Sequence, residues 1–546
     1  MNGNTVIAKI LKAEGVEWIT AYPEQKLIDK VAMEGIRPII VRQERAGVNM
    51  ADGFSRINNG NKIGVFTMQR GPGAENAFGG VAQAFADSVP IILLPGGSPA
   101  DRFRIHPGFD SVDHYGGVTK VNAHLNQVER IPALMRHAFS QLKHGRLGPA
   151  LLEIPDDVGT TEYPHDSLDY QPVQKYRSGA DPDQVADLVG ALLRASCPVL
   201  TAGQGILYAE ATAELVELAE LINLPVLTSL AGKSAFPENH PMALGTGSHT
   251  HTQMAAHFLE KTDFFLGVGT SLTNFAFNPP VPKGIPVAQS TNCAEDVNKD
   301  HPIDYGAIGD AKLVLRQIIE EVKRQIGSQG RPDQNGVADE IREVQKAFMA
   351  EWGPRLASDE VPISPYRVFR DLASEVDIAN SIVTHDSGYP RDQLVPFWQP
   401  VTPRGYIGWG KSTQLGYGLG LALGAKLASP DKQVINIMGD AAFGMAGLDI
   451  ETAVRAEIGT VTIILNNGVM THYHAHMPYA TKHWGSNKFT GNYARVAEGL
   501  GAHAERVETP DQIRPTIRKA LEVSQSGRPS VLEMITKEEE NVAKFW

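Results

Sequence analysis

The sequence predicts an α/β protein of three doubly wound domains with mainly parallel sheets, in which the first and third domains are similar. Two observations support this prediction. Short apolar runs alternate with helical patterns along the whole chain, which is typical of parallel sheets covered by helices on both faces. Two polar stretches, 166–184 and 327–336, contain glycine and proline and have little to bury.

These stretches separate three expected domains, at 1–165, 183–328 and 355–546. In the first, strands are expected near 63 and 90, and in the third near 434 and 461, so both pairs of strands start 27 residues apart. That length fits one strand–helix–strand unit and hints at duplication. The middle domain has Gly203–Gly205 and Gly267–Ser271 where a nucleotide-binding fold places glycines, so we expect it to be Rossmann-like.

Composition excludes several classes of protein. The 546 residues carry a formal net charge of −12, which argues against a nucleic-acid partner. Two cysteines, Cys197 and Cys293, make neither a disulfide framework nor a cysteine-based zinc site, and their scarcity suits a reducing compartment. Glu14 interrupts any signal-peptide core, and no apolar run reaches the roughly 20 residues of a membrane span. We therefore expect a cytoplasmic protein with no membrane segment.

The most specific motif is Gly439-Asp440-Ala441-Ala442 followed by Asn466-Asn467. Each part follows an expected apolar strand, and neighbouring parallel strands have their carboxyl ends at the same sheet edge. A carboxylate, an amide oxygen and a backbone carbonyl suit Mg²⁺, with phosphate and water completing the shell. The alternative is a simple turn in which Asp440 is the N-cap of a helix.

Several motifs together resemble the thiamine-diphosphate-dependent superfamily of decarboxylases and acetohydroxyacid synthases. Besides the Gly-Asp…Asn motif, four further stretches match the superfamily in the same order along the chain. The resemblance extends over essentially the whole chain. These stretches are Arg42–Gly47 with Met50–Gly53, Gly71–Asn76, Asp87–Pro90 and Gly148–Asp157.

The resemblance implies that thiamine diphosphate and Mg²⁺ lie between the first domain of one subunit and the third domain of another. The active protein would then be a homodimer or homotetramer with shared sites. Asp440, the Asn467 side chain and the Val469 backbone oxygen match the metal ligands. The other matching cofactor-binding residues are Gly388, Gly439, Ala441 and Ala442 near the diphosphate, Leu415 as the apolar wedge, and Pro23 and Asn76 near the aminopyrimidine.

Glu44 matches the catalytic glutamate, which hydrogen-bonds the pyrimidine ring and activates the cofactor. It follows the apolar run at 39–41, so it should emerge at a strand end. The alternative is a surface carboxylate paired with Arg42 or Arg45.

Candidate substrate residues come from two stretches. Asp110 and His114 lie in a segment that the superfamily places close to the active site. His472, His474 and His476 follow the metal motif at alternate positions. Three interpretations of these histidines stay open: a solvated loop, substrate contact or proton transfer, and zinc, for which the sequence shows no carboxylate or cysteine completing the set.

The expected activity is formation or cleavage of a C–C bond next to a carbonyl, by decarboxylation or carboligation of a 2-oxo acid, aldehyde or acyloin. Departures from acetohydroxyacid synthases leave the substrate open: Glu24-Gln25 replaces Gly-Gly, Asp110-Ser111 replaces Gln-Glu, and Gly97 replaces a common glutamine. FAD is unexpected, because the middle domain lacks an arginine-rich pattern. One alternative is a 2-hydroxyacyl-CoA or oxalyl-CoA-type lyase, in which the C-terminal tail would cover the CoA, although the sequence shows no basic patch for its phosphates. The other alternative is a non-catalytic thiamine-diphosphate-binding protein.

Overall fold

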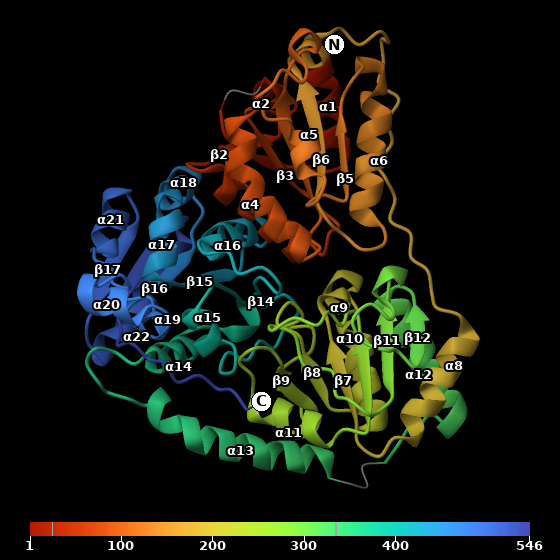
Figure 1. Cartoon of the computed structure of the whole chain (residues 1–546), viewed down its shortest axis with the longest axis vertical. Helices are drawn as coiled ribbons and strands as arrows, with labels where there is room; N and C mark the ends of the chain where they lie inside the picture. The colour runs from red at the N-terminus through yellow and green to blue at the C-terminus, as the bar shows by residue number, and fades with distance from the viewer. Residues whose placement is uncertain (24–25, 333–335, 546) are drawn as a thin grey trace.

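The computed structural model describes residues 1–23, 26–332 and 336–545. Within these ranges the chain forms three parallel sheets of six strands each, and helices cover both faces of each sheet (Figure 1). This confirms the predicted fold class. The first domain stands above the other two, which lie next to each other.

The first sheet has the strand order β2-β1-β3-β4-β6-β5. Its strands are β1 (Trp18–Ala21), β2 (Arg37–Ile40), β3 (Gly64–Met68), β4 (Ile91–Gly97), β5 (Val121–His124) and β6 (Ala150–Pro155). Its helices are α1 (Gly3–Ala13), α2 (Leu27–Met33), α3 (Glu44–Ile57), α4 (Pro72–Ala86), α5 (Ser111–Tyr115), α6 (Ile131–Lys143) and α7 (Asp156–Thr160).

The central sheet has the order β12-β11-β10-β7-β8-β9, which is the strand order of a Rossmann fold. Its strands are β7 (Pro198–Ala202), β8 (Val226–Thr228), β9 (Ala243–Thr246), β10 (Phe264–Val268), β11 (Val287–Thr291) and β12 (Tyr305–Ile308). Its helices are α8 (Pro182–Arg194), α9 (Gln204–Ala209), α10 (Thr212–Ile222), α11 (Gln253–Lys261) and α12 (Ala311–Ile326).

The third sheet repeats the strand order of the first, β14-β13-β15-β16-β18-β17, so the predicted similarity of the two domains is confirmed. Its strands are β13 (Ser381–His385), β14 (Tyr406–Ile407), β15 (Gln433–Gly439), β16 (Val461–Asn466), β17 (His503–Val507) and β18 (Ser530–Ile535). Its helices are α14 (Pro365–Glu375), α15 (Tyr389–Leu394), α16 (Tyr417–Ala428), α17 (Asp440–Ala446), α18 (Ile450–Ala456), α19 (Tyr473–His476), α20 (Pro478–Trp484), α21 (Tyr493–Gly499) and α22 (Pro510–Gln525), and α13 (Val337–Leu356) precedes them.

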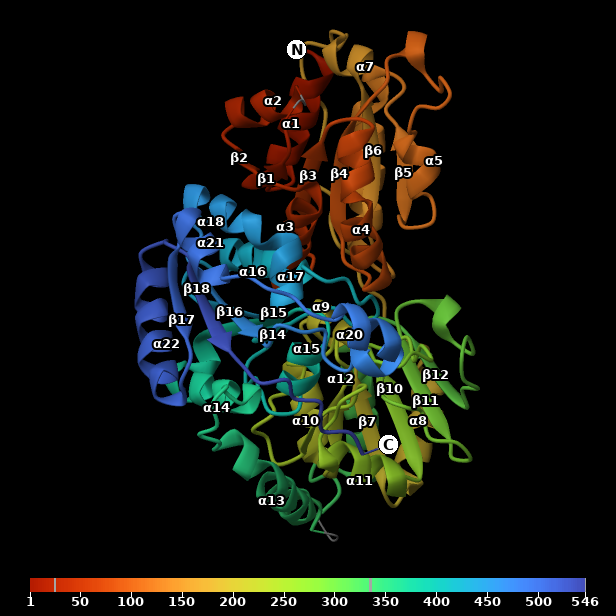
Figure 2. The same cartoon turned by 60° about the vertical axis from the view of Figure 1, so that its left-hand side comes forward.

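Helices α3 and α16 join the first and third domains at close range (Figure 2). A Cβ atom on Gly53 of α3 would lie 2.2 Å from the carbonyl oxygen of Leu421, and one on Gly424 of α16 would lie 2.0 Å from that of Met50. Only glycine at these two positions lets the helix backbones approach so closely. The contact holds the N-terminal end of α3, where Glu44 lies, against the third domain.

A buried carboxylate, Asp87, connects the first and third domains near this crossing. It accepts hydrogen bonds from Nη2 of Arg56 at 2.9 Å and from the backbone N–H groups of Gly410 and Lys411, each at 2.9 Å. Arg56 in turn donates to Asp52 and to the carbonyl oxygen of Gly408. Because each of these polar groups finds a partner, the network offsets the cost of removing its charges from water.

We predict that Arg56→Met strongly destabilises the protein, because it leaves Asp52 and Asp87 buried without their cation. Removing one partner of a buried pair costs about 3–5 kcal/mol. Arg342→Met is the matched control, because its ion pair with Asp339 lies on the surface and should contribute less than about 1 kcal/mol. Urea unfolding measures both variants, and equal midpoints would contradict the role assigned to Arg56.

Candidate functional site

The carboxyl ends of β15 and β16 meet at one edge of the third sheet, where Gly439 pairs in register with Leu465. Asp440 is only 4% exposed, and its carboxylate accepts hydrogen bonds from the N–H groups of Ala441 at 2.8 Å and Gly468 at 3.0 Å. Burial raises the pKa of this carboxyl, and the N–H donors oppose the shift. Asp440 therefore links the loops that follow the two strands. Gly439, and not Asp440, is the N-cap of α17, so the simple capping alternative is wrong.

Asn467 and Val469 lie in the loop that Asp440 contacts. The Asn467 amide donates to Oγ1 of Thr471 at 2.8 Å, and its oxygen accepts from the N–H of Val469 at 3.1 Å. The structure thus brings the three expected metal-ligand residues into two adjoining loops. Their donor set consists of oxygen atoms, the chemistry that Mg²⁺ prefers.

The backbone beside Asp440 is open at two glycines. Gly388 has φ +86°, a conformation that favours glycine, and a Cβ there would meet only Pro390, at 4.0 Å. A Cβ on Gly439 would meet the same proline at 3.5 Å. Ala441 is half-buried, whereas the side chain of Ala442 packs into the core next to α16. The backbone here leaves room for a ligand above Asp440.

Asp386, which follows β13, positions the segment that carries Leu415. Its buried carboxylate accepts from the N–H groups of Ser387, Gly416 and Gly418 at 2.8–3.0 Å, and burial raises its pKa to about 6. Leu415 is half-buried against the core shared by the first and third domains. Sequence reasoning missed the role of Asp386, although a carboxylate directly after an apolar strand is the same signal that identified Asp440.

Glu44 begins α3 at the carboxyl end of β2 and is only 5% exposed. Over the described ranges, its carboxylate accepts no hydrogen bond and forms no ion pair. Arg42 instead approaches Glu451 at 3.8 Å, and Arg45 interacts electrostatically with Asp386. The ion-pair alternative for Glu44 is therefore wrong. A buried carboxylate without a partner is costly, which makes Glu44 a candidate for function rather than stability.

The other two first-domain residues lie at the same sheet edge. Pro23 follows β1 in a bend, and its neighbours Glu24 and Gln25, the predicted departure from Gly-Gly, lie outside the described residues. Asn76 is exposed in the first turns of α4. Gly73, on the same helix, brings its Cβ position within 3.6 Å of Oε1 of Glu44.

A cavity of about 390 Å³, open to solvent, lies at this edge and is lined by Asp110 and Glu153. Between these two residues lies His124, whose Nδ1 is 2.9 Å from Glu153 and whose Nε2 is 3.6 Å from Asp110. The Glu153 hydrogen bond raises the pKa of His124. A Cβ on Gly97 would lie 2.6 Å from the Glu153 carboxylate, so the glycine that replaces a common glutamine makes room for this arrangement. Sequence reasoning missed His124 and Glu153.

His114 does not join this cluster. Its Nδ1 is 2.7 Å from the carbonyl oxygen of Asp110, and its ring stacks on Phe109 at 4.4 Å. The side chain is exposed on α5.

The three histidines after the metal motif are exposed and lie beside the C-terminal segment. His472 and His474 each place Nδ1 close to Glu540, at 3.3 and 3.4 Å, and His474 also lies near Glu538. The sequence-based argument that no carboxylate completes the set is therefore wrong. His476 contacts the rings of His472 and Tyr473 instead.

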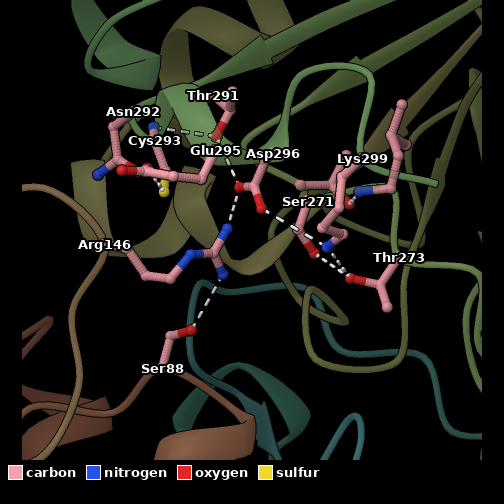
Figure 3. Close-up of polar contacts among 12 residues, drawn as sticks. Ser88, Arg146, Ser271, Thr273, Thr291, Asn292, Cys293, Glu295, Asp296 and Lys299 are labelled. Carbon is pink, nitrogen blue, oxygen red and sulfur yellow. Dashed lines mark hydrogen bonds and ion pairs between the residues drawn. The ribbon is translucent and has the colours of Figure 1, made fainter. Parts of the chain in front are cut away.

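The central domain has a crevice of about 180 Å³, partly open to solvent, at the carboxyl ends of β7, β10, β11 and β12. Figure 3 shows Arg146 between Ser88 of the first domain, at 3.2 Å, and Asp296 of the central domain. Asp296 also accepts from Thr291 at 3.1 Å. The crevice gathers five cationic side chains that the sequence scatters, and Asp87, Asp296 and Asp310 line the same space. The five cationic residues are Lys143, Arg146, Lys175, Arg177 and Lys411.

Three family models match the chain in order. They describe the N-terminal TPP binding domain of thiamine pyrophosphate enzymes over residues 1–116, their central domain over 185–318 and their C-terminal TPP binding domain over 386–534. No helix among the described residues has both the length and the apolar character of a membrane span.

Named relatives align with nearly the whole chain. A probable acetolactate synthase large subunit of Methanocaldococcus jannaschii is 30% identical, covering 98% of this chain and 92% of the relative. One from Methanococcus aeolicus is 29% identical, covering 95% and 90%. Glyoxylate carboligase of Escherichia coli O157:H7 is 27% identical, covering 93% and 88%.

We predict that Glu153→Gln lowers the pKa of His124 toward its usual 6.5, because the charged acceptor that stabilises the imidazolium is lost. His124 in the parent should then stay protonated to higher pH than in the variant. NMR titration with ¹³C-labelled histidine measures this shift. Glu75→Gln, which lines the same cavity, is the control, and an unchanged His124 pKa in Glu153→Gln would contradict the assignment.

Proposed function

This chain belongs to the thiamine pyrophosphate enzyme family, and on that premise we propose that it makes or breaks a carbon–carbon bond next to a carbonyl group. The expected reaction is decarboxylation or carboligation of a 2-oxo acid, aldehyde or acyloin. The observation that carries this proposal is Glu44, a buried carboxylate at the edge of the first sheet that has no partner among the residues the structure describes. Relatives named acetolactate synthase and glyoxylate carboligase support carboligation.

The third domain fits a diphosphate held through Mg²⁺. Asp440, the side chain of Asn467 and the backbone oxygen of Val469 would hold the ion, and the open backbone at Gly388 and Gly439 would admit the phosphates. Asp440 is already oriented by the N–H of Gly468, so little rearrangement is needed to present its oxygens. When bound, thiamine diphosphate supplies a thiazolium carbon that can add to a carbonyl carbon.

Glu44 would hold and move a proton at its carboxyl oxygen. Burial and the absence of a cationic partner leave its oxygens free to hydrogen-bond a nitrogen of the cofactor's pyrimidine ring. Leu415 would orient the cofactor by packing, because its side chain lies between the two domains. Burying Glu44 costs desolvation free energy, and a non-catalytic binding protein would gain nothing in return. This disfavours the non-catalytic alternative.

We further propose that the site is shared between two copies of the chain. Apolar side chains stay exposed on the elements next to the α3–α16 crossing: Phe78 and Phe85 on α4, Met445 on α17 and Leu448 just after it. Exposed apolar patches of this kind are typical of interfaces. A second copy would cover them and bring its Glu44 to the first copy's Asp440.

The central crevice supports a second candidate, a lyase acting on a CoA thioester. Its five cationic side chains suit the phosphates of CoA, although three of them are already in ion pairs: Lys143 with Glu14, Arg146 with Asp296, and Arg177 with Glu210 and Asp310. Incubating the protein with Mg²⁺, thiamine diphosphate and either 2-oxo acids or 2-hydroxyacyl-CoA thioesters, with products identified by mass spectrometry, separates the two functions. Products from the 2-oxo acids without added FAD support the first, and products only from the thioesters favour the second.

For the catalytic glutamate, we predict that Glu44→Gln lowers turnover by roughly 10² to 10⁴, the usual range for losing a general acid–base group. The amide keeps size and polarity but cannot exchange the proton. Cofactor affinity, measured by calorimetry, should stay near that of the parent. Asp440→Ala is the matched variant and should lose cofactor affinity while the protein stays folded, as circular dichroism would check. Parent-like turnover in Glu44→Gln would remove Glu44 from the mechanism.

For the shared site, we predict that Leu448→Asp shifts the chain from dimer toward monomer, because a charge cannot be buried at an apolar interface without a partner. Activity should fall with the dimer fraction as the protein is diluted. Sedimentation velocity measures the assembly. Val496→Asp, an exposed apolar position on α21, is the control. A fully active monomer would exclude a site shared between subunits.

A further inference from the structure

We propose that His472, His474, Glu538 and Glu540 bind one Zn²⁺ ion, which fastens the C-terminal segment to the loop after β16. This site is separate from the oxygen-ligand site at Asp440 and does not depend on the proposed reaction. Its ligands come from two segments more than 60 residues apart, and only the fold brings them together.

His474, Glu538 and Glu540 form a compact set of ligand atoms, and Glu540 connects His472 to this set. Nδ1 of His472 lies 3.3 Å from one oxygen of Glu540, and Nδ1 of His474 lies 3.4 Å from the other. Ligands bound at zinc distances of about 2.0–2.1 Å stand roughly 3.3 Å from one another, whereas a charge-assisted hydrogen bond would bring them to about 2.7–2.9 Å. Ligand atoms of His474, Glu538 and Glu540 all lie within 4.8 Å of one another.

The extended C-terminal segment presents both carboxylates on the same side. In extended backbone, alternate side chains point to opposite sides, so Glu538 and Glu540 face outward while Glu539 is buried. Hydrogen bonds to the main chain hold the segment in place: the N–H of Thr536 donates to the carbonyl oxygen of Asn466 at 2.9 Å, and the side-chain amide of Gln393 donates to the carbonyl oxygen of Glu539 at 2.8 Å. The backbone N–H of His472 donates to Glu538 at 3.2 Å, which holds the loop next to the carboxylates.

The cluster carries negative charge that no side-chain cation neutralises. Within the ranges that the structure describes, neither Glu538 nor Glu540 forms an ion pair with lysine or arginine. Burial and the charges of Glu540, Asp392 and Glu538 raise the pKa of nearby Tyr389. Two imidazoles and two carboxylates suit Zn²⁺, whereas Mg²⁺ takes oxygen ligands in octahedral geometry and would not compete.

The proposed ion would add a third attachment to a segment that spans two domains. Beyond Glu540, the N–H of His251 in the central domain donates to the carbonyl oxygen of Ala543 at 3.1 Å. The N–H of Phe545 donates back to Nε2 of His251 at 2.8 Å. Zinc would therefore connect the loop that carries Asn467 and Val469, through the C-terminal segment, to the central domain.

Calorimetric titration of tag-free, metal-free full-length protein with Zn²⁺ tests the site. We expect one ion per chain, and we expect Co²⁺ in its place to give the visible absorption of a tetrahedral complex. Glu540→Gln and His474→Gln should each weaken Zn²⁺ binding by more than roughly tenfold. Both side chains are about half exposed, so thermal melting of the metal-free variants should match the parent.

Two controls distinguish this site from its surroundings. His483→Gln, whose ring stacks on Tyr479 outside the cluster, should bind Zn²⁺ as the parent does. Asp440→Ala should also keep Zn²⁺ binding, even with excess Mg²⁺ present, so loss of the proposed activity and loss of the zinc site are separable. The absence of stoichiometric binding, equal affinity in Glu540→Gln, or abolition by Asp440→Ala would each overturn the proposal.

Discussion

The carboxylate of Asp87 determines how the three domains are arranged. It lies at the end of α4, yet its hydrogen bonds reach Arg56 on α3 and the backbone of Gly410 and Lys411 in the third domain. Its backbone oxygen also accepts from Gln204 of the central domain. The carboxylate needs its donors from the first and third domains to offset its desolvation, and the backbone oxygen of the same residue adds a contact to the central domain. The close crossing of α3 and α16 lies beside this network and joins the same two domains.

The number of hydrogen bonds that each buried carboxylate accepts distinguishes the carboxylates that stabilise the fold from the candidates for function. Asp87 and Asp386 each accept at least three hydrogen bonds, so their burial stabilises particular backbone arrangements. Asp440 accepts two and keeps further capacity for a ligand. Glu44 accepts none within the described residues, although it is buried to the same degree. A fold can tolerate such a group where its proton or its lone pairs serve a ligand, which is why the proposed chemistry is centred there.

The repeated strand order of the first and third sheets gives both domains the same kind of polar sheet edge, and the proposed cofactor site joins the first-domain edge of one copy to the third-domain edge of another. In each sheet, polar side chains follow the carboxyl ends of the strands, and the α3–α16 contact brings helices from the two sheets together. The central sheet has a different order, and its crevice lies at the reversal between β7 and β10. Both candidate sites therefore lie at the carboxyl ends of parallel strands, and different side chains line them.

Sequence alone determined the features that depend on neighbours along the chain. Apolar runs predicted the strands. Glu44, Asp440 and Asn467 were predicted as site residues because they lie at or just past strand ends, which places them at a sheet edge. Tertiary structure decided what each polar group meets. Contacts between distant segments leave Glu44 without a partner among the described residues. They also place Glu153 next to Gly97 and His124, and Glu540 against His472 and His474. Such contacts follow from the packing of whole domains, which cannot be predicted from the spacing of residues along the sequence.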